Sequence, residues 1–377
     1  MNFELNEEQV ALADSLQRVL ADHYTFDKRR ALALDPRAHD PNAWSRLAEL
    51  GVTALTLPEA HGGFGGRMQD LLPVMQAFGR ALSLEPFLPS IVLGATALRL
   101  VGDGPLQARL LPSVAQGATL LAWAHEEADG RHAPAWTGTH ARQQDGRWTL
   151  TGTKTLVLCA GLADHFIVSA RVQGAPDDVD GRALFLVDAS APGTDLREFR
   201  LMDDTAAGEL VLHDAAAAPL HDPFDGLSAR HAIEGTVHAG IAAACADMTG
   251  SMQAAFELAM DYLRTRKQFG RFIGENQALR HRAADMLVNL EMARSMALAA
   301  AIAADSGDGE EARRDLHRAK LSVGRHARQL AHSAIQLHGG IGMTEEYAVG
   351  HHLRRIHVLD QLFGDAEAHA ARLGALS

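Results

Sequence analysis

The sequence predicts an α+β protein, with a helical section at each end and a β section between them. Apolar residues recur at helical spacing before residue 118 and after residue 223, whereas the intervening segment is rich in β-branched and apolar side chains. With 377 residues, the chain is long enough for two or three domains. We therefore predict an N-terminal α-helical domain over residues 1–118, a central antiparallel β domain over 119–222 and a C-terminal long-helix bundle over 223–377.

The N-terminal section is predicted to consist of short helices joined by turns. Apolar residues keep helical spacing from Val10 to Leu20, and a second such stretch begins at Leu71. Between them lies the glycine cluster of residues 62–66, which breaks the pattern. Because this cluster lacks the strand-turn-helix context of a dinucleotide-binding loop, we interpret it as a surface turn.

The central section contains three runs typical of strands, at residues 148–158, 166–171 and 183–187. Asp145-Gly146 and Pro192-Gly193 supply turns between strands. These features predict a small, mostly antiparallel β domain.

The C-terminal section carries three long helical patterns. One apolar stripe runs from Ile233 to Met260, and further stripes begin at Met286 and at Leu316. Several long helices with small alanine contacts predict an antiparallel bundle. Methionines in such stripes more often belong to a core than to a substrate pocket, so we assign them to the core.

Charge and cysteine content exclude several classes of protein. The chain has 47 acidic and 35 basic residues and a formal net charge of -12, which disfavours binding to nucleic acid or to anionic membranes. Cys159 and Cys245 lie far apart, so neither a disulfide framework nor a zinc site is expected, and a cytoplasmic location fits best. The longest wholly apolar stretch, Met296 to Ala304, predicts neither a signal peptide nor a membrane span. No metal is predicted, because the adjacent His351 and His352 would diverge on a helix and are expected at the surface.

Two motifs in the C-terminal section carry the chemistry. The first, Tyr262-Leu-Arg-Thr-Arg-Lys-Gln-Phe-Gly270, places Arg266 near the end of a long helix. A guanidinium there can leave the helix surface and make bidentate bonds to a phosphate, and Phe269 offers a flat apolar face.

The second motif, Ala334-Ile-Gln-Leu-His-Gly-Gly-Ile-Gly-Met-Thr-Glu345, places Gln336 before Gly339 and Gly340. Glycines at a helix end allow backbone amides to approach a ligand closely. Taken alone, each motif would more often be a solvated helix-end charge or an ordinary helix cap. Together, they favour a ligand that contains a diphosphate.

At this separation and in this domain order, the two motifs resemble the signatures of the acyl-CoA dehydrogenase family. Weaker family patterns occur at Leu57-Pro-Glu59 and at Leu150-Thr-Gly-Thr-Lys154, so the resemblance spans nearly the whole chain. It implies an acyl-CoA dehydrogenase fold, FAD as the cofactor and α,β-desaturation of an acyl-CoA. It also implies which residues hold an FAD shared between two chains: Arg266, Gln268 and Phe269 at the pyrophosphate, and Gln336, Gly339 and Gly340 at the adenine end.

The resemblance leaves the catalytic residue unknown. The family reaction removes an α-proton while a β-hydride passes to the flavin, and this requires a carboxylate base. The commonest position of that base corresponds to Phe363, and the position used by a second group in the family corresponds to Gly240. Asp247 and Glu234 lie about two turns from Gly240, at roughly 5.4 Å per turn, which is too far for simple substitution. Asp247 is kept as an alternative base.

Two further segments depart from the catalytic members of the family. The chain has His125-Glu126-Glu127-Ala128 in place of a Thr-Glu-Pro segment, and Leu156-Val157-Leu158 in place of Trp-Ile-Thr. Both segments would contact the flavin, so the ring contacts predicted by the resemblance do not carry over.

Retained FAD residues without a base resemble the small, non-catalytic subunit of heteromeric bacterial acyl-CoA dehydrogenases. His125 with Glu127, and Leu362-Phe-Gly-Asp365 with His369, resemble that subgroup in particular. The resemblance implies a catalytic partner subunit, an acyl-CoA substrate and an electron-transfer flavoprotein as acceptor. Three alternatives stay open: a homodimer or homotetramer, a competent enzyme with a non-standard base, and a relative that has lost FAD and acts only as an interaction module.

Overall fold

The computed structural model describes residues 7–35, 37–307 and 309–376. These residues form two compact units, which we call the helical unit and the sheet unit. The helical unit comprises residues up to Arg30, Met68–Ser83 and the chain from Ile241 onward, and the sheet unit comprises Ala31–Arg67 and Leu84–Gly240. The chain therefore enters the helical unit three times.

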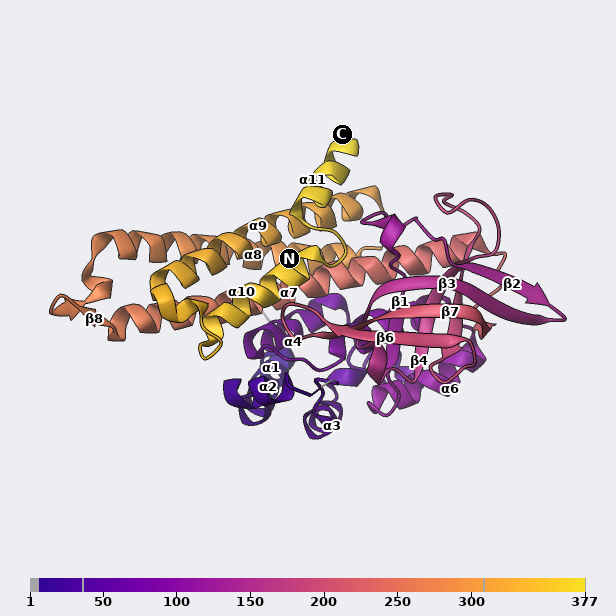
Figure 1. The fold of residues 1–377 in the computed structure, drawn as a ribbon, viewed down its shortest axis with the longest axis horizontal. Helices are drawn as coiled ribbons and strands as arrows, with labels where there is room; N and C mark the ends of the chain where they lie inside the picture. Colours follow the sequence, from indigo (N-terminus) through magenta and orange to yellow (C-terminus); the bar gives the residue numbers. More distant parts are fainter. Residues whose placement is uncertain (1–6, 36, 308, 377) are drawn as a thin grey trace. The chain divides into compact units, whose positions relative to one another are not determined.

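The helical unit is built from long helices, of which α8 and α9 lie side by side (Figure 1). The stripes predicted from Met286 and from Leu316 are buried in α8 and α9, which confirms the bundle and the core position of Met286. Two helices, α2 (Phe26–Leu32) and α7 (Gly226–Thr265), run across the boundary between the units. The other elements are α1 (Glu7–His23), α4 (Met68–Ala81), β8 (Lys267–Gln268), β9 (Arg271–Phe272), η6 (Ile273–Glu275), α8 (Gln277–Asp305), α9 (Glu310–His338), η7 (Gly339–Met343), α10 (Ala348–Gln361) and α11 (Ala366–Ala375).

The sheet unit combines short helices with one seven-stranded sheet. Its helical elements are α3 (Pro41–Glu49), η1 (Val52–Ala54), η2 (Glu59–His61), the π-helix η3 (Phe87–Ala95), α5 (Thr96–Val101), α6 (Gly104–Ala115), η4 (Ala128–Gly130) and η5 (Ala160–Leu162). Its strands are β1 (Leu121–Ala124), β2 (His140–Gln144), β3 (Arg147–Leu158), β4 (His165–Arg171), β5 (Arg182–Asp188), β6 (Thr194–Arg200) and β7 (Ala206–Pro219).

The strands β4, β2, β3, β7 and β5 pair in a closed ring, because β5 also pairs with β4. The strand β1 adds to β4 in parallel, and β6 adds to β7 in antiparallel fashion. Inside the ring lies an apolar core that includes Trp148, Leu150, Phe166 and Phe185. Most pairings are antiparallel, as predicted, and the three predicted strands correspond to β3, β4 and β5.

Sequence analysis did not identify β1, β2, β6 or β7. The longest of these, β7, includes the run Ala215 to Ala218, whose small side chains give no strand signal. Its partners β3, β5 and β6 impose the extended conformation, so tertiary pairing overrides local preference here.

The expected surface position of two histidines is wrong. His351 and His352 are both buried on α10. His351 Nδ1 accepts a bond from the Arg29 guanidinium at 3.0 Å, and its ring packs edge-on against Phe26. Burial lowers the pKa of His352 to about 3, so this side chain is neutral in the folded chain. Among the described residues, no group of three or more His, Cys, Asp or Glu is placed to hold a metal ion.

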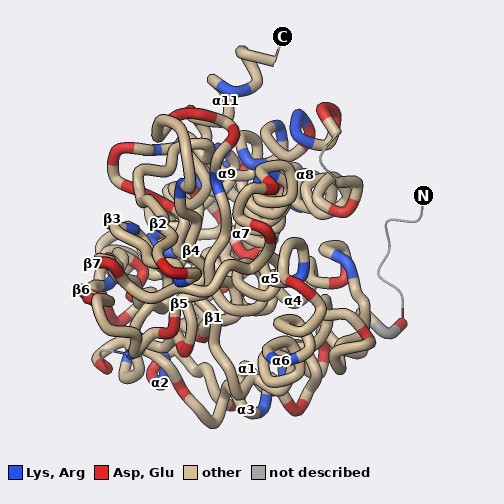
Figure 2. Tube along the Cα trace, turned by 90° about the vertical axis from the view of Figure 1, so that its right-hand side faces the viewer, with Lys and Arg blue, Asp and Glu red and all other residues tan. Residues whose placement is uncertain are grey.

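Charged residues of both signs occur in many segments of the described chain (Figure 2). Figure 2 shows basic and acidic segments interspersed along the chain trace. One described helix, α8, is long and apolar enough to cross a membrane by length and composition, and 44% of its most apolar window is buried inside the structure. Core helices of globular proteins pass the same test, and Met286 and Leu290 of α8 belong to the bundle core.

Candidate cofactor site

The first motif forms a tight hairpin directly after the longest helix. The helix α7 ends at Thr265, and β8 then pairs with β9 so that Lys267 lies opposite Phe272. The two turn residues, Phe269 and Gly270, have φ angles of 52° and 78°, as a two-residue type I′ turn requires. Glycine adopts positive φ freely, but an aromatic residue there is an outlier. Because strained residues cluster at functional sites, the strained and fully exposed Phe269 makes this tip a candidate binding site.

The second motif forms the end of α9. The last helical residue is His338, and Gly339 follows with a φ of 63° and donates its N–H back to the carbonyls of Gln336 and Ile335. A Cβ atom on Gly339 or Gly340 would meet no atom within 4 Å, so the space beside this backbone is open. The exposed backbone of the two glycines can therefore be approached by a ligand.

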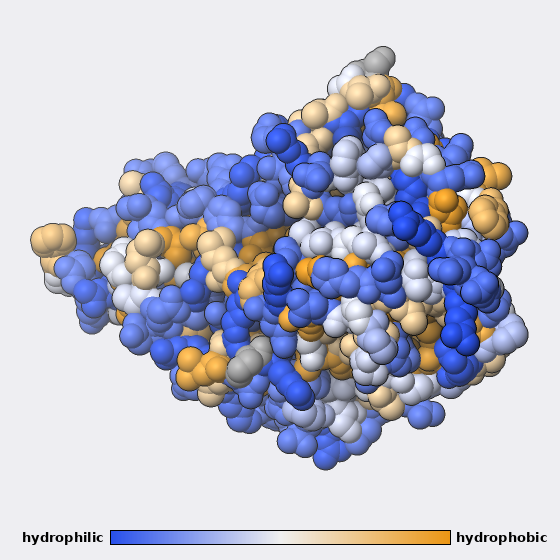
Figure 3. All heavy atoms as spheres, turned by 45° about the vertical axis from the view of Figure 1, so that its right-hand side comes forward, coloured by the Kyte–Doolittle hydropathy of each residue, from blue (hydrophilic) through white to orange (hydrophobic). Residues whose placement is uncertain are grey.

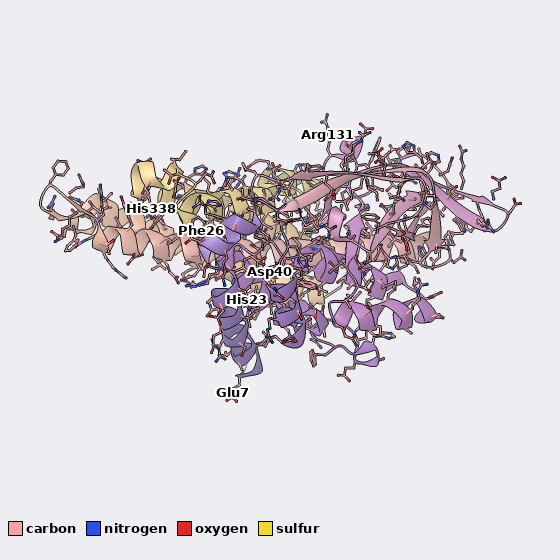
Figure 4. The ribbon with its side chains drawn as sticks, turned by 60° about the horizontal axis from the view of Figure 1, so that its bottom comes forward. Glu7, His23, Phe26, Asp40, Arg131 and His338 are labelled. Atoms are coloured by element: carbon pink, nitrogen blue, oxygen red, sulfur yellow. The ribbon has the colours of Figure 1, made fainter. Side chains whose placement is uncertain are left out.

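Aromatic packing brings the two motifs together within the helical unit. The Tyr262 ring, four residues before Arg266, lies 4.7 Å from the His338 ring between ring centroids. The other neighbour of His338 is Tyr347, at 4.9 Å, and Figure 4 labels His338 at this helix end. Residues more than 70 positions apart in the sequence thus form one exposed corner of the bundle.

The polar side chains at this corner are unused within the chain. The side chains of Arg266, Gln268 and Gln336 are exposed and make no hydrogen bond or ion pair with any other described residue. Their neighbours differ, because Arg271 donates to Asn276 Oδ1 at 2.7 Å and the Lys267 ammonium lies 4.6 Å from the Phe272 ring centroid. A free guanidinium, two free side-chain amides, an aromatic plane and an accessible glycine backbone fit a dinucleotide that carries a diphosphate.

Phe363 and Gly240, the two positions at which the resemblance places a base, differ in conformation, and neither carries a carboxylate. Phe363 lies between α10 and α11 with a φ of 63°, and its side chain is half-buried in the helical unit. Gly240 lies inside α7 and is buried in the sheet unit. Neither residue can accept a proton.

The two alternative carboxylates are bound to arginines. Asp247 is fully buried, and its oxygens accept bonds from Arg355 Nε at 3.2 Å and Nη2 at 2.5 Å. Glu234 accepts a bond from Arg230 Nε at 2.9 Å, one helical turn away. A carboxylate held by a bidentate guanidinium is stabilised in its charged form and is a weak proton acceptor. The structure therefore disfavours Asp247 as a base.

The segment that replaces Thr-Glu-Pro contributes to a buried polar network, a role that sequence analysis missed. Lys154 is fully buried, and its ammonium donates to Glu127 Oε1 at 2.7 Å, to Ser169 Oγ at 3.0 Å and to the His125 carbonyl at 3.2 Å. Glu127 in turn accepts the backbone N–H groups of Gly138 and Thr139. Lys154 and Glu127 thereby hold the two ends of the segment between β1 and β2 together.

His125 completes this network as a neutral ring. Its Nδ1 lies 2.8 Å from Ser169 Oγ and its Nε2 lies 3.0 Å from the Pro134 carbonyl. Since a carbonyl only accepts, Nε2 carries the proton, and Nδ1 accepts from the serine hydroxyl. Burial, reinforced by Lys154 and Arg182, lowers the pKa of His125 to about 3. The sequence signal that could have identified the network was a basic residue at an inward position of a predicted strand, Lys154.

The segment Leu156-Val157-Leu158 interrupts the ladder between β3 and β7. The register shifts between Lys154 and Val157, and Leu156 has a φ of 53°. A positive φ is strained for leucine, and bulges of this kind often lie next to functional sites.

A separate cavity of about 200 Å³ in the helical unit is lined by α1, α4, α7 and α8. Its two arginines are already neutralised, because Arg80 binds Glu257 and Arg294 binds Glu291. The cavity therefore offers no free charge to an anion, and it contains none of the residues predicted to bind a cofactor.

Comparison with known proteins identifies three matching family models. The acyl-CoA dehydrogenase N-terminal, middle and C-terminal domains match residues 6–118, 122–215 and 231–375. Acyl-CoA dehydrogenase FadE12 of Mycobacterium tuberculosis is 29% identical over 366 residues, covering 92% of this chain and 90% of the relative.

Two solved assemblies have the same fold along nearly their whole length. A variant of the Tcur3481-Tcur3483 steroid ACAD is 31% identical with a TM-score of 0.87, covering 98% of this chain and 97% of the other. The ChsE4-ChsE5 complex from Mycobacterium tuberculosis is 25% identical with a TM-score of 0.88, covering 100% and 98%. These matches confirm the predicted fold class and the resemblance from which it was drawn.

Proposed function

We propose that this chain, which belongs to the acyl-CoA dehydrogenase family, is one subunit of a heteromeric acyl-CoA dehydrogenase. In this proposal the chain completes the FAD site and its partner subunit supplies the base. Members of this family are flavoproteins, and related structures such as that of PigA contain FAD, so the prediction of FAD is confirmed for the family. One observation carries the proposal. The side chains predicted to bind the diphosphate are exposed and have no partner among the described residues, whereas Phe363 and Gly240, at which the resemblance places the base, carry no carboxylate.

The proposed roles follow from what each group can do. FAD, when bound, supplies the acceptor for a hydride. Arg266 would bind the diphosphate through a charge-assisted bidentate contact, with Gln268 donating beside it and Phe269 covering an apolar face. Gln336 and the exposed backbone of Gly339 and Gly340 would hold the adenine end.

Exposed apolar side chains support contact with a second chain. Leu287, Val288 and Met292 of α8 are 45%, 62% and 49% exposed, and Ile341 and Met343 of η7 are 44% and 76% exposed. Figure 3 shows apolar groups among the hydrophilic atoms of the surface. Apolar residues of this size at the surface are typical of an interface between subunits. Two of the related structures are named as two-component assemblies, which agrees with a heteromeric partner.

The remaining parts of the proposal concern partners and location. The substrate would be an acyl-CoA, the electron acceptor an electron-transfer flavoprotein, and the compartment the cytoplasm, which agrees with the two buried thiols Cys159 and Cys245. The domain limits at residues 118 and 222 stay part of the same proposal. A homodimer or homotetramer is the alternative assembly.

Anaerobic addition of acyl-CoA tests the proposal. The chain is purified alone and together with a glutamate-bearing acyl-CoA dehydrogenase subunit, and flavin bleaching is followed with a panel of fatty, dicarboxylic and steroid side-chain thioesters. We expect bleaching only with the partner present. Bleaching by the chain alone would show that it is a competent enzyme, and a colourless protein that takes up no FAD in either form would show that it is an interaction module.

A matched pair of variants sharpens the test at the position of the base. Phe363→Glu supplies a carboxylate where the resemblance places one, and Phe363→Gln supplies the same shape without the charge. In an assembly that holds flavin at this chain's own site, we expect bleaching at that site with the glutamate variant and none with the glutamine variant.

A further inference from the structure

The connection between α10 and α11, which we call the loop and define as residues 360–365 with the last two residues of α10 included, is held in place by a buried cation. Lys320 of α9 is fully buried, and its ammonium donates to the main-chain carbonyls of Asp360 at 2.7 Å and Gly364 at 3.0 Å. A third loop carbonyl, that of Phe363, accepts a bond from Arg372 Nη1 at 3.3 Å. The backbone on both sides of residue 363 is therefore fixed by side chains from two neighbouring helices.

The conformation of this loop requires such support. Phe363 and Gly364 have φ angles of 63° and 104°. Glycine adopts positive φ freely, whereas phenylalanine seldom does, so the strain lies at Phe363. A strained backbone of this kind persists only where the surroundings over-determine it. The two bonds from Lys320 lie on either side of Phe363, because the Asp360 carbonyl precedes it and the Gly364 carbonyl follows it.

The charge of Lys320 is balanced without disturbing these bonds. The carboxylate of Asp360 lies 4.0 Å from the ammonium and 3.5 Å from Arg328 Nε, yet accepts no hydrogen bond from the described residues. Gly324 makes room for it, since a Cβ atom there would lie 2.1 Å from Asp360 Oδ1. Burial raises the pKa of Asp360 and lowers the pKa of Lys320. The Asp360 carboxylate thus balances the charge of the Lys320 ammonium, whereas the two carbonyls fix its position through hydrogen bonds.

We infer that Lys320 is a positioning residue that sets the backbone, and hence the side-chain direction, of residue 363. The inference rests on the proposed function in one respect only, which is that residue 363 occupies the position of the family base. The chain then contains the contacts that orient residue 363, although that residue is a phenylalanine.

Amide hydrogen exchange tests the device in the protein as purified. Lys320→Met removes both bonds to the loop, so we expect the Gly364 amide, bonded to the Gln361 carbonyl, to exchange about tenfold faster or more. Peptides from the β8–β9 hairpin should exchange as before. Asp360→Asn keeps both carbonyls, so loop exchange should stay near that of the unmodified chain. Equal loop opening in both variants would show that the ion pair, not the carbonyl clamp, holds the loop and would overturn the inference.

Two further variants keep the test decisive. Lys320→Arg retains a cation and should restore most of the protection, which covers the case in which Lys320→Met does not fold. Arg325→Met is the control, because Arg325 lies on the same helix and makes only an exposed pair with Glu367 at 3.0 Å. Rapid exchange throughout the chain in Lys320→Arg would show that Lys320 acts by supporting the whole fold rather than the loop.

A kinetic arm separates positioning from folding. In the Phe363→Glu variant, Lys320→Met should lower kcat about tenfold or more while KM and flavin content stay unchanged, because a misplaced base loses rate rather than binding. If Phe363→Glu is inactive in every background, the proposed function fails, while the exchange experiment still decides the role of Lys320. If KM and kcat change together, positioning is overturned.

Discussion

The buried network of the sheet unit and the exposed corner of the helical unit use similar side chains in opposite ways. In the network, Lys154 is fully buried, Glu127 is largely buried, and both are satisfied within the chain. At the corner, the side chains of Arg266 and Gln336 are exposed and have no hydrogen-bond or ion-pair partner among the described residues. Charged groups are costly to bury unless they are fully paired, so the network is a structural device. Groups left unpaired at a helix end remain available to a ligand.

This comparison also separates two kinds of strain. Phe269, at the hairpin tip, has a positive φ without covering contacts, since its ring is fully exposed. Phe363 also has a positive φ, but here Lys320 binds main-chain carbonyls close to it in the sequence. The first arrangement fits a contact with a ligand or a second chain, and the second fits a residue aimed by its own chain.

The largest expected effect is loss of stability when the buried pair is broken. Lys154→Met leaves the Glu127 carboxylate without its cation and should lower the free energy of unfolding by about 3–5 kcal/mol. Urea unfolding followed by the fluorescence of Trp123 and Trp148 measures it. Arg197→Met, which removes an exposed pair with Glu209 on the same sheet, is the control and should cost about 1 kcal/mol or less. Equal costs would contradict the distinction between the two regions.

A smaller effect is expected at the exposed corner, and on a different quantity. Arg266→Ala removes a charge-assisted contact worth about 1.5–3 kcal/mol, so FAD should bind about 10- to 150-fold more weakly. The free energy of unfolding of the flavin-free chain should not change. Flavin content after dialysis and flavin titration measure the effect, with Arg264→Ala at the same helix end as the control. Unchanged flavin affinity would remove Arg266 from the site.

The smallest expected effect is the change in the free energy of unfolding for each unit of pH. His125 has a folded pKa of about 3 and an ordinary value of 6.5, so between these values the unfolded chain binds a proton that the folded chain does not. Its contribution is complete above pH 6.5 and is lost as pH falls toward 3, at about 1.4 kcal/mol per pH unit. His352 adds to the same slope. His125→Gln should reduce the slope of unfolding free energy between pH 6 and about 4.5 by roughly one proton. An unchanged slope would show that His125 is protonated in the folded chain.

Sequence analysis predicted the order of helical, β and long-helix sections, because helical periodicity and β-branched composition are local signals. It also selected Arg266, Phe269 and Gln336, which the structure places at one corner. It could not identify β7, whose small residues become a strand only through three partner strands. It also placed His351 at the surface, since nothing in a helical pattern shows that Arg29 lies against it.

The sequence by itself determined that Phe363 and Gly240 cannot act as bases, because this property belongs to the residues, and it predicted which side chains would hold a dinucleotide. Tertiary structure decided which charged groups form ion pairs or hydrogen bonds within the chain. Asp247 became half of an ion pair only because α10 brings Arg355 to it, and Lys320 became a clamp only because the end of α10 and the loop after it present their carbonyls to α9. Availability of a charge depends on its neighbours in space, which no local pattern records.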